Sequence, residues 1–446
     1  MDLVSCFVKL GCYAVFRQVF ILGRNIIWML NGTYWQHRRC WKSPVYYAES
    51  AHVHNIAARR KLDVLLGPAN FMDFTLTHHS FENPAYVLKD NVSLYQVTRD
   101  QAIFVEVPEE MDVWRCQHGS FLRQAQFNNA HRVITMPLHA FHTLADSIGD
   151  PDAELVFVQN TARCGSTLLV RVFEETEECV AFSEPDALNA VASYATHPGW
   201  KHADVSRVTR DAVRMLCKPV HRMKGQTRAY LMKLTSSSID GVPMLQELYP
   251  NSKHMFMYRD CLKVSESLMR IKEVLPLLKL GYVTANDKFD VISTVIRLIG
   301  LSNEGCGKIR IKHQFQIGVW LWCIVMKKYE NMVQSGVEMA AVAYEDIAGD
   351  PEYALTEIFK YCNVPLHLLK SGSRALEKDA QGNSELAASN IKTKKVDVGI
   401  TPKVRDLCNS TLNKLAIVCF SCTYYHKEMV AMQLSMTPIS ECTHGD

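Results

Sequence analysis

The sequence predicts an α/β protein with three layers, in which a central parallel sheet is covered by helices on both faces. From residue 154 onward, short apolar runs alternate with amphipathic helical segments, which is typical of parallel strands joined by helical crossovers. The runs predicted as strands are 155–159, 180–182, 255–258 and 339–343. A chain of 446 residues with 48% hydrophobic content is long enough to bury a sizeable core around such a sheet.

The amino-terminal segment, residues 1–60, is predicted to be amphipathic, and its apolar first 30 residues are interrupted by cations. Lys9, Arg17 and Arg24 cut it into uncharged runs far shorter than the ~20 residues that span a membrane. At about 100° per residue, the three cations fall on one narrow stripe of a helix. Two interpretations stay open: residues 1–35 lie in a membrane interface with cations on anionic headgroups, or the helix packs on the protein body.

Three further parts complete the predicted organisation. Residues 61–150 mix strand-like runs with turn residues, which predicts an α+β region that extends the parallel-sheet domain at its amino-terminal side. That domain covers residues 151–430, and residues 431–446 form a tail.

Charge and cysteine usage exclude two classes of protein. A formal charge of +3 from 49 basic and 46 acidic residues is too small for a nucleic-acid binder that relies on bulk electrostatics. The 15 cysteines are scattered without the dense spacing of a small disulfide scaffold, so free thiols are expected. The expected free thiols and the missing secretory signal together favour a cytoplasmic protein, which could be attached peripherally to a membrane.

A small-residue turn follows the strand at 155–159 and leads into a helix. It consists of Arg163, Cys164, Gly165, Ser166, Thr167 and Leu168. Glycine permits close approach of the backbone, and the hydroxyls, the arginine and the helix N-terminus suit a phosphate. The Gly-Lys-Ser/Thr ending that binds ATP or GTP with Mg²⁺ is missing, and no metal is expected. On this turn alone, a phosphate site and a plain strand–helix connection are equally supported.

The run Arg-Cys-Gly-Ser-Thr-Leu-Leu resembles the 5′-phosphosulfate loop of the sulfotransferases that use 3′-phosphoadenosine 5′-phosphosulfate (PAPS), with Cys164 in place of the usual serine. The run YPNSKHMFMYRDCLKVSESL resembles the family's 3′-phosphate motif, which would assign Arg259 and Ser267 to that phosphate, with Ser265 as the near competitor. The run VAYEDIAGDPEYALTEIFKYCNVP extends the similarity. Asn383 and Ser384 fall where relatives carry a loop that closes over the nucleotide.

The resemblance also implies a catalytic set. Thr235 occupies the position of the histidine base of cytosolic members, whereas Glu184 lies 21 residues after Arg163, as in the tyrosylprotein group, which like many Golgi and bacterial members uses a glutamate base. Glu184 would be the general base, and Arg163 and Lys233 would stabilise charge on the leaving oxygen. The competing role for Glu184 is to cap the helix that begins near Pro185.

The resemblance thus implies a P-loop NTPase-like sulfotransferase fold and transfer of a sulfuryl group from PAPS to a hydroxyl. Lipids, sterols and small alcohols are the first acceptor classes, with carbohydrate and tyrosine left open, and residues 61–150 are expected to build part of the acceptor pocket. Two alternatives remain: a kinase-like phosphoryl-transfer enzyme, and a non-catalytic nucleotide-binding member. The glutamate-type site makes a Golgi membrane the alternative location. The sequence predicts no oligomeric state.

Overall fold

The computed structural model describes residues 3–414 with gaps. The undescribed residues within that span are 62, 197–198, 221–222, 224, 273–274, 276–277, 280–281, 283–311, 381, 383–385 and 388–400. The predicted tail at 431–446 lies outside the described part.

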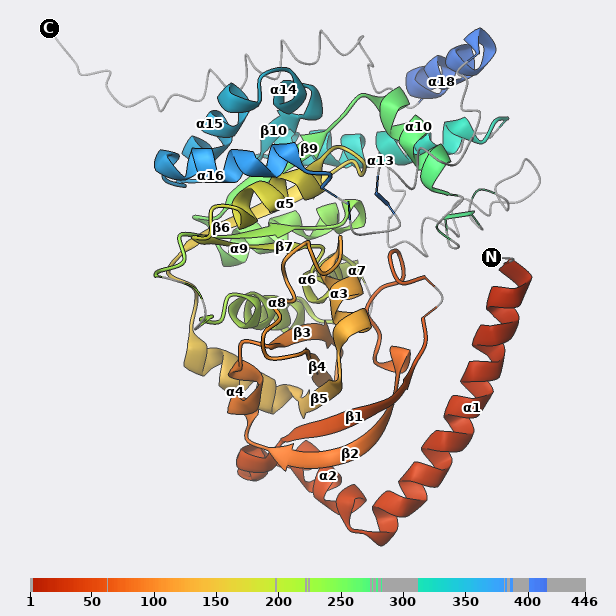
Figure 1. The fold of residues 1–446 in the computed structure, drawn as a ribbon, viewed down its shortest axis with the longest axis vertical. Coiled ribbons are helices and arrows are strands. Elements are labelled where there is room, and N and C mark those ends of the chain that lie inside the picture. Colours follow the sequence, from red (N-terminus) through yellow and green to blue (C-terminus); the bar gives the residue numbers. More distant parts are fainter. Residues whose placement is uncertain are drawn as a thin grey trace, which may run out of the picture.

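Residues 154–343 contain a five-stranded parallel sheet with the strand order β10-β9-β6-β8-β7 (Figure 1). Its strands are β6 Glu154–Asn160, β7 Cys179–Ser183, β8 Ala229–Lys233, β9 Lys253–Tyr258 and β10 Ala340–Ala343. The predicted α/β class with a central parallel sheet is therefore confirmed, and each of the four predicted strands corresponds to one of these strands. The sequence-based prediction omitted β8, which lies between β6 and β7.

Both faces of the parallel sheet are buried, as expected for parallel strands covered by crossovers. On β6, Val156 and Val158 belong to the core shared with helices α5 and α15, whereas Leu155 and Phe157 belong to the core on the opposite face. The helices that follow β6 are α5 Ser166–Glu174, α6 Asp186–Asn189, α7 Val191–Thr196, α8 His202–Leu216, α9 Val242–Leu248, α10 Cys261–Ile271, α13 Phe315–Gln334, α14 Tyr344–Gly349, α15 Pro351–Tyr361, α16 Leu369–Ser373 and α18 Pro402–Lys414. The alternation along β6 thus gives the three predicted layers.

A second, antiparallel sheet lies in the amino-terminal half, with the order β2-β1-β5-β4-β3. Its strands are β1 Ala51–Arg59, β2 Phe74–Glu82, β3 Val92–Val97, β4 Gln101–Glu106 and β5 Arg132–Pro137. The helices here are α1 Leu3–Leu30, α2 Thr33–Lys42, α3 Leu122–Asn129 and α4 Leu138–Ile148. The strand β1, which falls in the segment 1–60, is thus an integral strand of this sheet.

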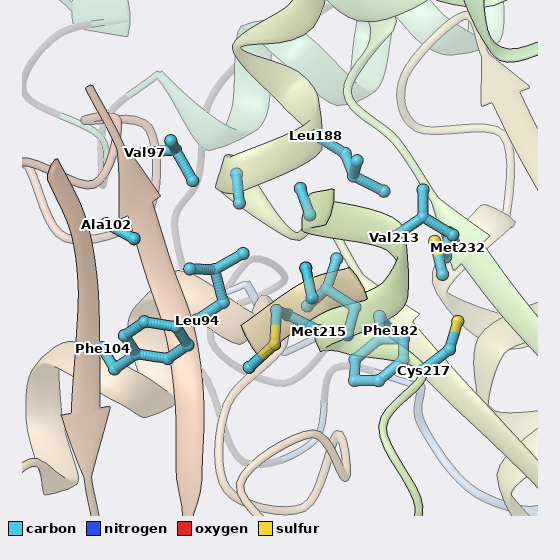
Figure 2. Close-up of a cluster of buried hydrophobic side chains, with 14 of the residues drawn as sticks. Leu94, Val97, Ala102, Phe104, Phe182, Leu188, Val213, Met215, Cys217 and Met232 are labelled. Carbon is cyan, nitrogen blue, oxygen red and sulfur yellow. The ribbon is translucent and has the colours of Figure 1, made fainter. Parts of the chain in front are cut away.

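One hydrophobic core joins the two sheets. Figure 2 shows Leu94 and Phe104 of the antiparallel sheet on one side of this core and Phe182 and Met232 of the parallel sheet on the other, with Met215 of α8 between them. Because these side chains belong to one buried cluster, the amino-terminal region packs on the parallel-sheet domain as part of one hydrophobic unit.

Helix α1 runs along one edge of the molecule, beside β2 (Figure 1). Two of its three cations face the protein, whereas Lys9 is exposed: Arg17 Nε donates to the carbonyl oxygen of Phe74 at 3.2 Å, and Arg24 Nη1 donates to that of Leu76 at 3.1 Å. These two cations therefore cover carbonyl groups of an edge strand, as the packing interpretation expects. No helix in the described ranges has the length and apolar character needed to cross a membrane.

Candidate active site

The predicted site residues gather at the carboxyl edge of the parallel sheet. The strand β6 leads into the turn with Arg163, β7 into Glu184 and β9 into Arg259, while β8 ends at Lys233. The chain leaves β6 toward β7 and later crosses β6 again to reach β9, so β6 lies at a topological switch point. Open α/β sheets bind ligands at such an edge, outside the carboxyl ends of their strands.

The turn after β6 is held in a tight, unusual conformation. Ala162 and Arg163 have φ angles of 61° and 51°, in the left-handed region, which costs a non-glycine residue about 1–2 kcal/mol. The side chain of Asn160 supports this conformation: its oxygen accepts from the Ala162 N–H at 2.9 Å, and its nitrogen donates to the Leu234 carbonyl at 2.7 Å. The strain is therefore held by contacts to β6 and to the segment after β8, which is typical of a functional turn.

Gly165 begins helix α5 and is needed for two reasons. Its φ of 79° is left-handed, and a Cβ atom at this position would lie only 2.6 Å from the ring of Tyr344, the first residue of α14. The first turn of α5 leaves backbone N–H groups without intrahelical acceptors, and the helix dipole favours an anion there. The missing side chain at Gly165 thus lets the Tyr344 ring pack against the N-terminus of α5, which is suited to an anion.

The ring of Tyr344 also connects this turn to Arg259. The Arg259 guanidinium carbon lies 4.3 Å from the ring centroid, which is a cation–π contact. Trp322 Nε1 donates to the Arg259 carbonyl oxygen at 2.9 Å and fixes its backbone. Arg259 Nε is buried and has no hydrogen-bond partner among the described residues. Arg259 thus has a buried donor that an anion could satisfy.

Arg163 reaches the helix that follows Arg259. Its Nε donates to Ser267 Oγ at 2.9 Å, so the two segments predicted to hold opposite ends of a nucleotide are in direct contact. The competing residue Ser265 is fully buried instead, where its hydroxyl donates to the Cys261 carbonyl at 2.9 Å. The structure therefore brings Ser267, and not Ser265, to the arginine.

Electrostatics make this region receptive to negative charge. Burial and the neighbouring Arg259 lower the pKa of the Arg163 guanidinium, although Cys164 and Asp379 act in the opposite direction. Two guanidinium groups close enough to repel each other favour a bound anion, because its charge relieves that repulsion. Arg163, Arg259 and Ser267 are therefore suited to one or more phosphate groups.

The remaining side chains of the turn are buried or partly buried. Cys164 is fully buried in the core beneath the turn, and burial raises the pKa of its thiol. Ser166 and Thr167 are also buried, and Leu168 packs as a partly buried residue against the same core. The thiol of Cys164 consequently has the surroundings of a packing residue.

Glu184 lies in a buried ion-pair network. Its left-handed backbone, with a φ of 56°, is held by a 2.6 Å hydrogen bond from its N–H to the Lys233 carbonyl. Its carboxylate pairs with Lys233 Nζ and, at 2.7 Å, with Arg123 Nη2. Burial raises the pKa of the Glu184 carboxyl, but Lys233 and Arg123 outweigh burial, so that pKa lies below its ordinary value. The group is therefore a carboxylate at neutral pH.

The helix-capping role for Glu184 is not seen. The N-cap of α6 is Pro185, and no side chain accepts a hydrogen bond there. The carboxylate is thus committed to the two cations.

Arg123 was not predicted from the sequence. It lies on α3, is almost completely buried, and pairs with Asp186 at 3.2 Å in addition to Glu184. Its Nε donates to the Leu65 carbonyl at 2.8 Å, and the Phe121 ring lies 5.1 Å from Lys233 Nζ. The amino-terminal region therefore forms one wall of the site, and no local pattern around Arg123 indicated this.

Two of the predicted site residues have no described structure, and the described residues can also be searched for metal ligands. Asn383 and Ser384 lie outside the described residues. Within the described ranges, no group of three or more His, Cys, Asp or Glu side chains is arranged to hold a metal ion.

No protein-family model matches the chain, and no curated protein gives a significant match. Among solved structures, it is similar to the sulfotransferase STF9 from Mycobacterium avium, at 12% identity and a TM-score of 0.35, over 63% of this chain and 81% of that one. It is also similar to a sulfotransferase from Alicyclobacillus acidocaldarius, at 11% identity and a TM-score of 0.34, over 62% and 99%. A third similar structure is the mouse sulfotransferase SULT7A1 complexed with PAP, at 12% identity and a TM-score of 0.35, over 66% and 96%. These scores are too low to identify the chain, so its function is inferred below from its own residues.

Proposed function

We propose that this protein is a sulfotransferase that transfers a sulfuryl group from PAPS to an acceptor hydroxyl. The observation that carries the proposal is the convergence of Arg163, Arg259 and Ser267 at the N-terminus of α5, at the same sheet edge as the Glu184–Lys233 pair. The two arginines fit a nucleotide with several anionic groups. The ion pair supplies a carboxylate that can accept a proton and an ammonium that can stabilise developing negative charge.

Each residue has a role in this proposal. Arg259 and Ser267 hold the 3′-phosphate, while Arg163 and the first N–H groups of α5 hold the 5′ end. Glu184 takes the proton from the acceptor hydroxyl as the acceptor oxygen bonds to sulfur and the bond from sulfur to the phosphate oxygen breaks. Lys233 stabilises the negative charge that develops on that phosphate oxygen. Such catalysis consists mainly of positioning and electrostatic stabilisation, as in phosphoryl transfer.

The side chains around Glu184 support an acceptor site on the side of the amino-terminal region. Arg123 orients the carboxylate through a 2.7 Å contact, and Phe121 places an aromatic ring beside Lys233. An aromatic wall next to the base suits lipid, sterol and other small alcohols, which are therefore the first acceptors to assay.

The first test measures nucleotide binding by thermal unfolding. Adenosine 3′,5′-bisphosphate (PAP), the expected product, should stabilise the full chain by about 2.7 kcal/mol at 100 times its Kd. The Arg259→Ala variant should lose most of this stabilisation. Stabilisation by ATP with Mg²⁺ but not by PAP would instead favour the kinase-like alternative.

A matched pair of serine variants sharpens the test. Ser267→Ala removes a hydroxyl that contacts Arg163 and should weaken PAP binding by roughly 5- to 10-fold. Ser265→Ala removes a buried hydroxyl that donates to the Cys261 carbonyl of its own helix and should leave PAP affinity unchanged. Equal effects of the two substitutions would contradict the assigned phosphate contact.

The second test measures transfer of label from ³⁵S-PAPS to a panel of lipid, sterol, small-alcohol, carbohydrate and tyrosine acceptors. With the best acceptor, Glu184→Gln should bind PAP but lower transfer by roughly 10²- to 10⁴-fold, the usual contribution of a general base. A folded variant that binds PAP and retains full transfer would exclude Glu184 as the base. PAP binding by the wild-type chain without transfer to any acceptor would favour the non-catalytic alternative.

A further inference from the structure

Helix α1 is attached to the protein by a polar stripe and turns an apolar face outward. Besides the hydrogen bonds of Arg17 and Arg24 to β2, the Tyr13 hydroxyl lies 2.8 Å from Thr75 Oγ1. Trp28 is buried against histidine rings of β1 and β2. At about 100° per residue, Tyr13, Arg17, Arg24 and Trp28 lie within an arc of about 60° on the helix. This narrow arc faces the body.

The opposite side of α1 is a continuous apolar surface. Its large side chains are at least 50% exposed and comprise Val8, Val15, Phe16, Val19, Leu22, Ile26, Ile27, Met29 and Leu30. They span an arc of about 160° that does not overlap the arc facing the body. The helix has 28 residues and is about 42 Å long, so this surface is far more extensive than scattered exposed apolar residues would produce.

The charged side chains of α1 and α2 are all of one sign. Residues 3–48 contain no Asp or Glu, but they contain Lys9, Arg17, Arg24, Arg38, Arg39 and Lys42. Four of these cations are exposed, namely Lys9, Arg38, Arg39 and Lys42. Exposed Trp35 lies on α2 among the last three cations. An apolar face bordered by cations and an aromatic residue complements an anionic lipid surface.

We propose that the apolar face of α1 lies in the headgroup region of an anionic lipid bilayer and attaches the protein to the membrane surface. The inference does not depend on the sulfotransferase proposal. The orientation differs from the interfacial interpretation of the sequence, because Arg17 and Arg24 bind β2 while the neighbouring exposed cations face the solvent side. The hydrogen bonds from these two arginines to β2 hold the helix against the protein. In this proposal the helix axis therefore lies in the membrane plane.

A second copy of the chain is a poorer occupant of this face. Pairing two such segments would bring the four exposed cations of each copy toward those of the other, without a carboxylate in residues 3–48 of either chain. Like charges across an interface are unfavourable, whereas anionic headgroups neutralise the same cations. The charge pattern therefore favours lipid.

The test is flotation of the full chain with vesicles of phosphatidylcholine alone or with about 30% phosphatidylserine. The wild-type protein should float with the anionic vesicles, less with the neutral ones, and less in high salt. Val19→Glu with Leu22→Glu should lower the partition coefficient on anionic vesicles by roughly 100-fold, because two exposed apolar side chains no longer enter the lipid. Tyr353→Glu with Leu366→Glu is the matched control, because it adds the same charges to exposed apolar positions elsewhere and should float like the wild type.

The substituted side chains are exposed, so unchanged thermal unfolding should show that both double variants fold. Failure of the wild-type chain to float with either vesicle would overturn the proposal. It would equally be overturned if light scattering in the absence of lipid showed a dimer that Val19→Glu with Leu22→Glu converts to a monomer. Stabilisation by PAP is measured on the same samples, so failure to bind lipid is distinguishable from failure to bind nucleotide.

Discussion

The buried pair of Glu184 and Lys233 gives a quantitative test of the site through a double-mutant cycle. The side chains of Glu184 and Lys233 are only 10% and 4% exposed, so their attraction is weakly screened, about 4 kcal/mol for unit charges 4 Å apart at an effective dielectric of 20. Glu184→Gln leaves Lys233 and Arg123 without their shared carboxylate and should lower the free energy of unfolding by about 3–5 kcal/mol. Lys233→Met leaves Glu184 paired with Arg123 at 2.7 Å, so its cost should be only about 1–2 kcal/mol.

The asymmetry between the two substitutions is the decisive quantity. Urea unfolding followed by circular dichroism gives the free energy of each variant and of the double variant. The loss of unfolding free energy in the double variant should be about 2 kcal/mol smaller than the sum of the two single losses, because methionine needs no carboxylate partner. The described network is refuted if Lys233→Met costs as much as Glu184→Gln, or if the coupling energy is below about 0.5 kcal/mol.

Three further outcomes are expected. Glu184→Gln should tighten PAP binding by roughly 5-fold, measured by calorimetry, because Lys233 no longer has a carboxylate that competes with the nucleotide, and this gain should vanish in the Lys233→Met background. Gly165→Ala should lower the free energy of unfolding by about 2–4 kcal/mol and weaken PAP binding, because alanine is strained at the left-handed φ of this position and its Cβ displaces the Tyr344 ring; an unchanged urea midpoint would contradict the close contact. Burial raises the pKa of the Glu174 carboxyl to about 7 from an ordinary value near 4.5, so between these values the folded state holds a proton that the unfolded state lacks, and stability falls as pH rises. Glu174→Gln should accordingly raise the free energy of unfolding by about 1–3 kcal/mol at pH 8 and much less at pH 4.5, and equal gains at the two pH values would argue against the raised pKa.

The parallel sheet could be predicted because its strands are continuous apolar runs between helical segments. The strand β8, Ala229–Lys233, was missed although β7 and β10 are not longer than it, and its place between β6 and β7 depends on long-range pairing that no local pattern shows. Periodicity placed Arg17 and Arg24 on one stripe of α1, but the partner of that stripe could not be inferred. Carbonyl groups of an edge strand attract arginines as anionic headgroups do, and only the fold distinguishes the two.

The site residues that belong to recognisable motifs could be predicted from the sequence, whereas their packing could not. Spacing singled out Ser267, but its separation from Ser265 depends on packing: a Cβ on Gly318 of α13 would lie 2.8 Å from Ser265 Oγ, so that position faces the core. Cys164 belongs to the loop predicted to bind the 5′-phosphosulfate, whereas its thiol lies in the core beneath the turn. Arg123 belongs to a helix with no resemblance to a functional motif, and only tertiary structure brings it to Glu184.

The contact of Arg123 with Glu184 changes the relation between the two halves of the chain. If Lys233 were the only partner of the buried Glu184 carboxylate, movement of Lys233 toward a nucleotide would leave that carboxylate unpaired in a low dielectric. Arg123 removes this cost, since it remains bonded to Glu184 and is itself anchored by Asp186 and the Leu65 carbonyl. Lys233 can then exchange the carboxylate for an anionic ligand while Glu184 stays ionised and oriented. In the proposed mechanism the amino-terminal region therefore does more than wall off an acceptor pocket, because it supplies the cation that lets base and nucleotide share one lysine.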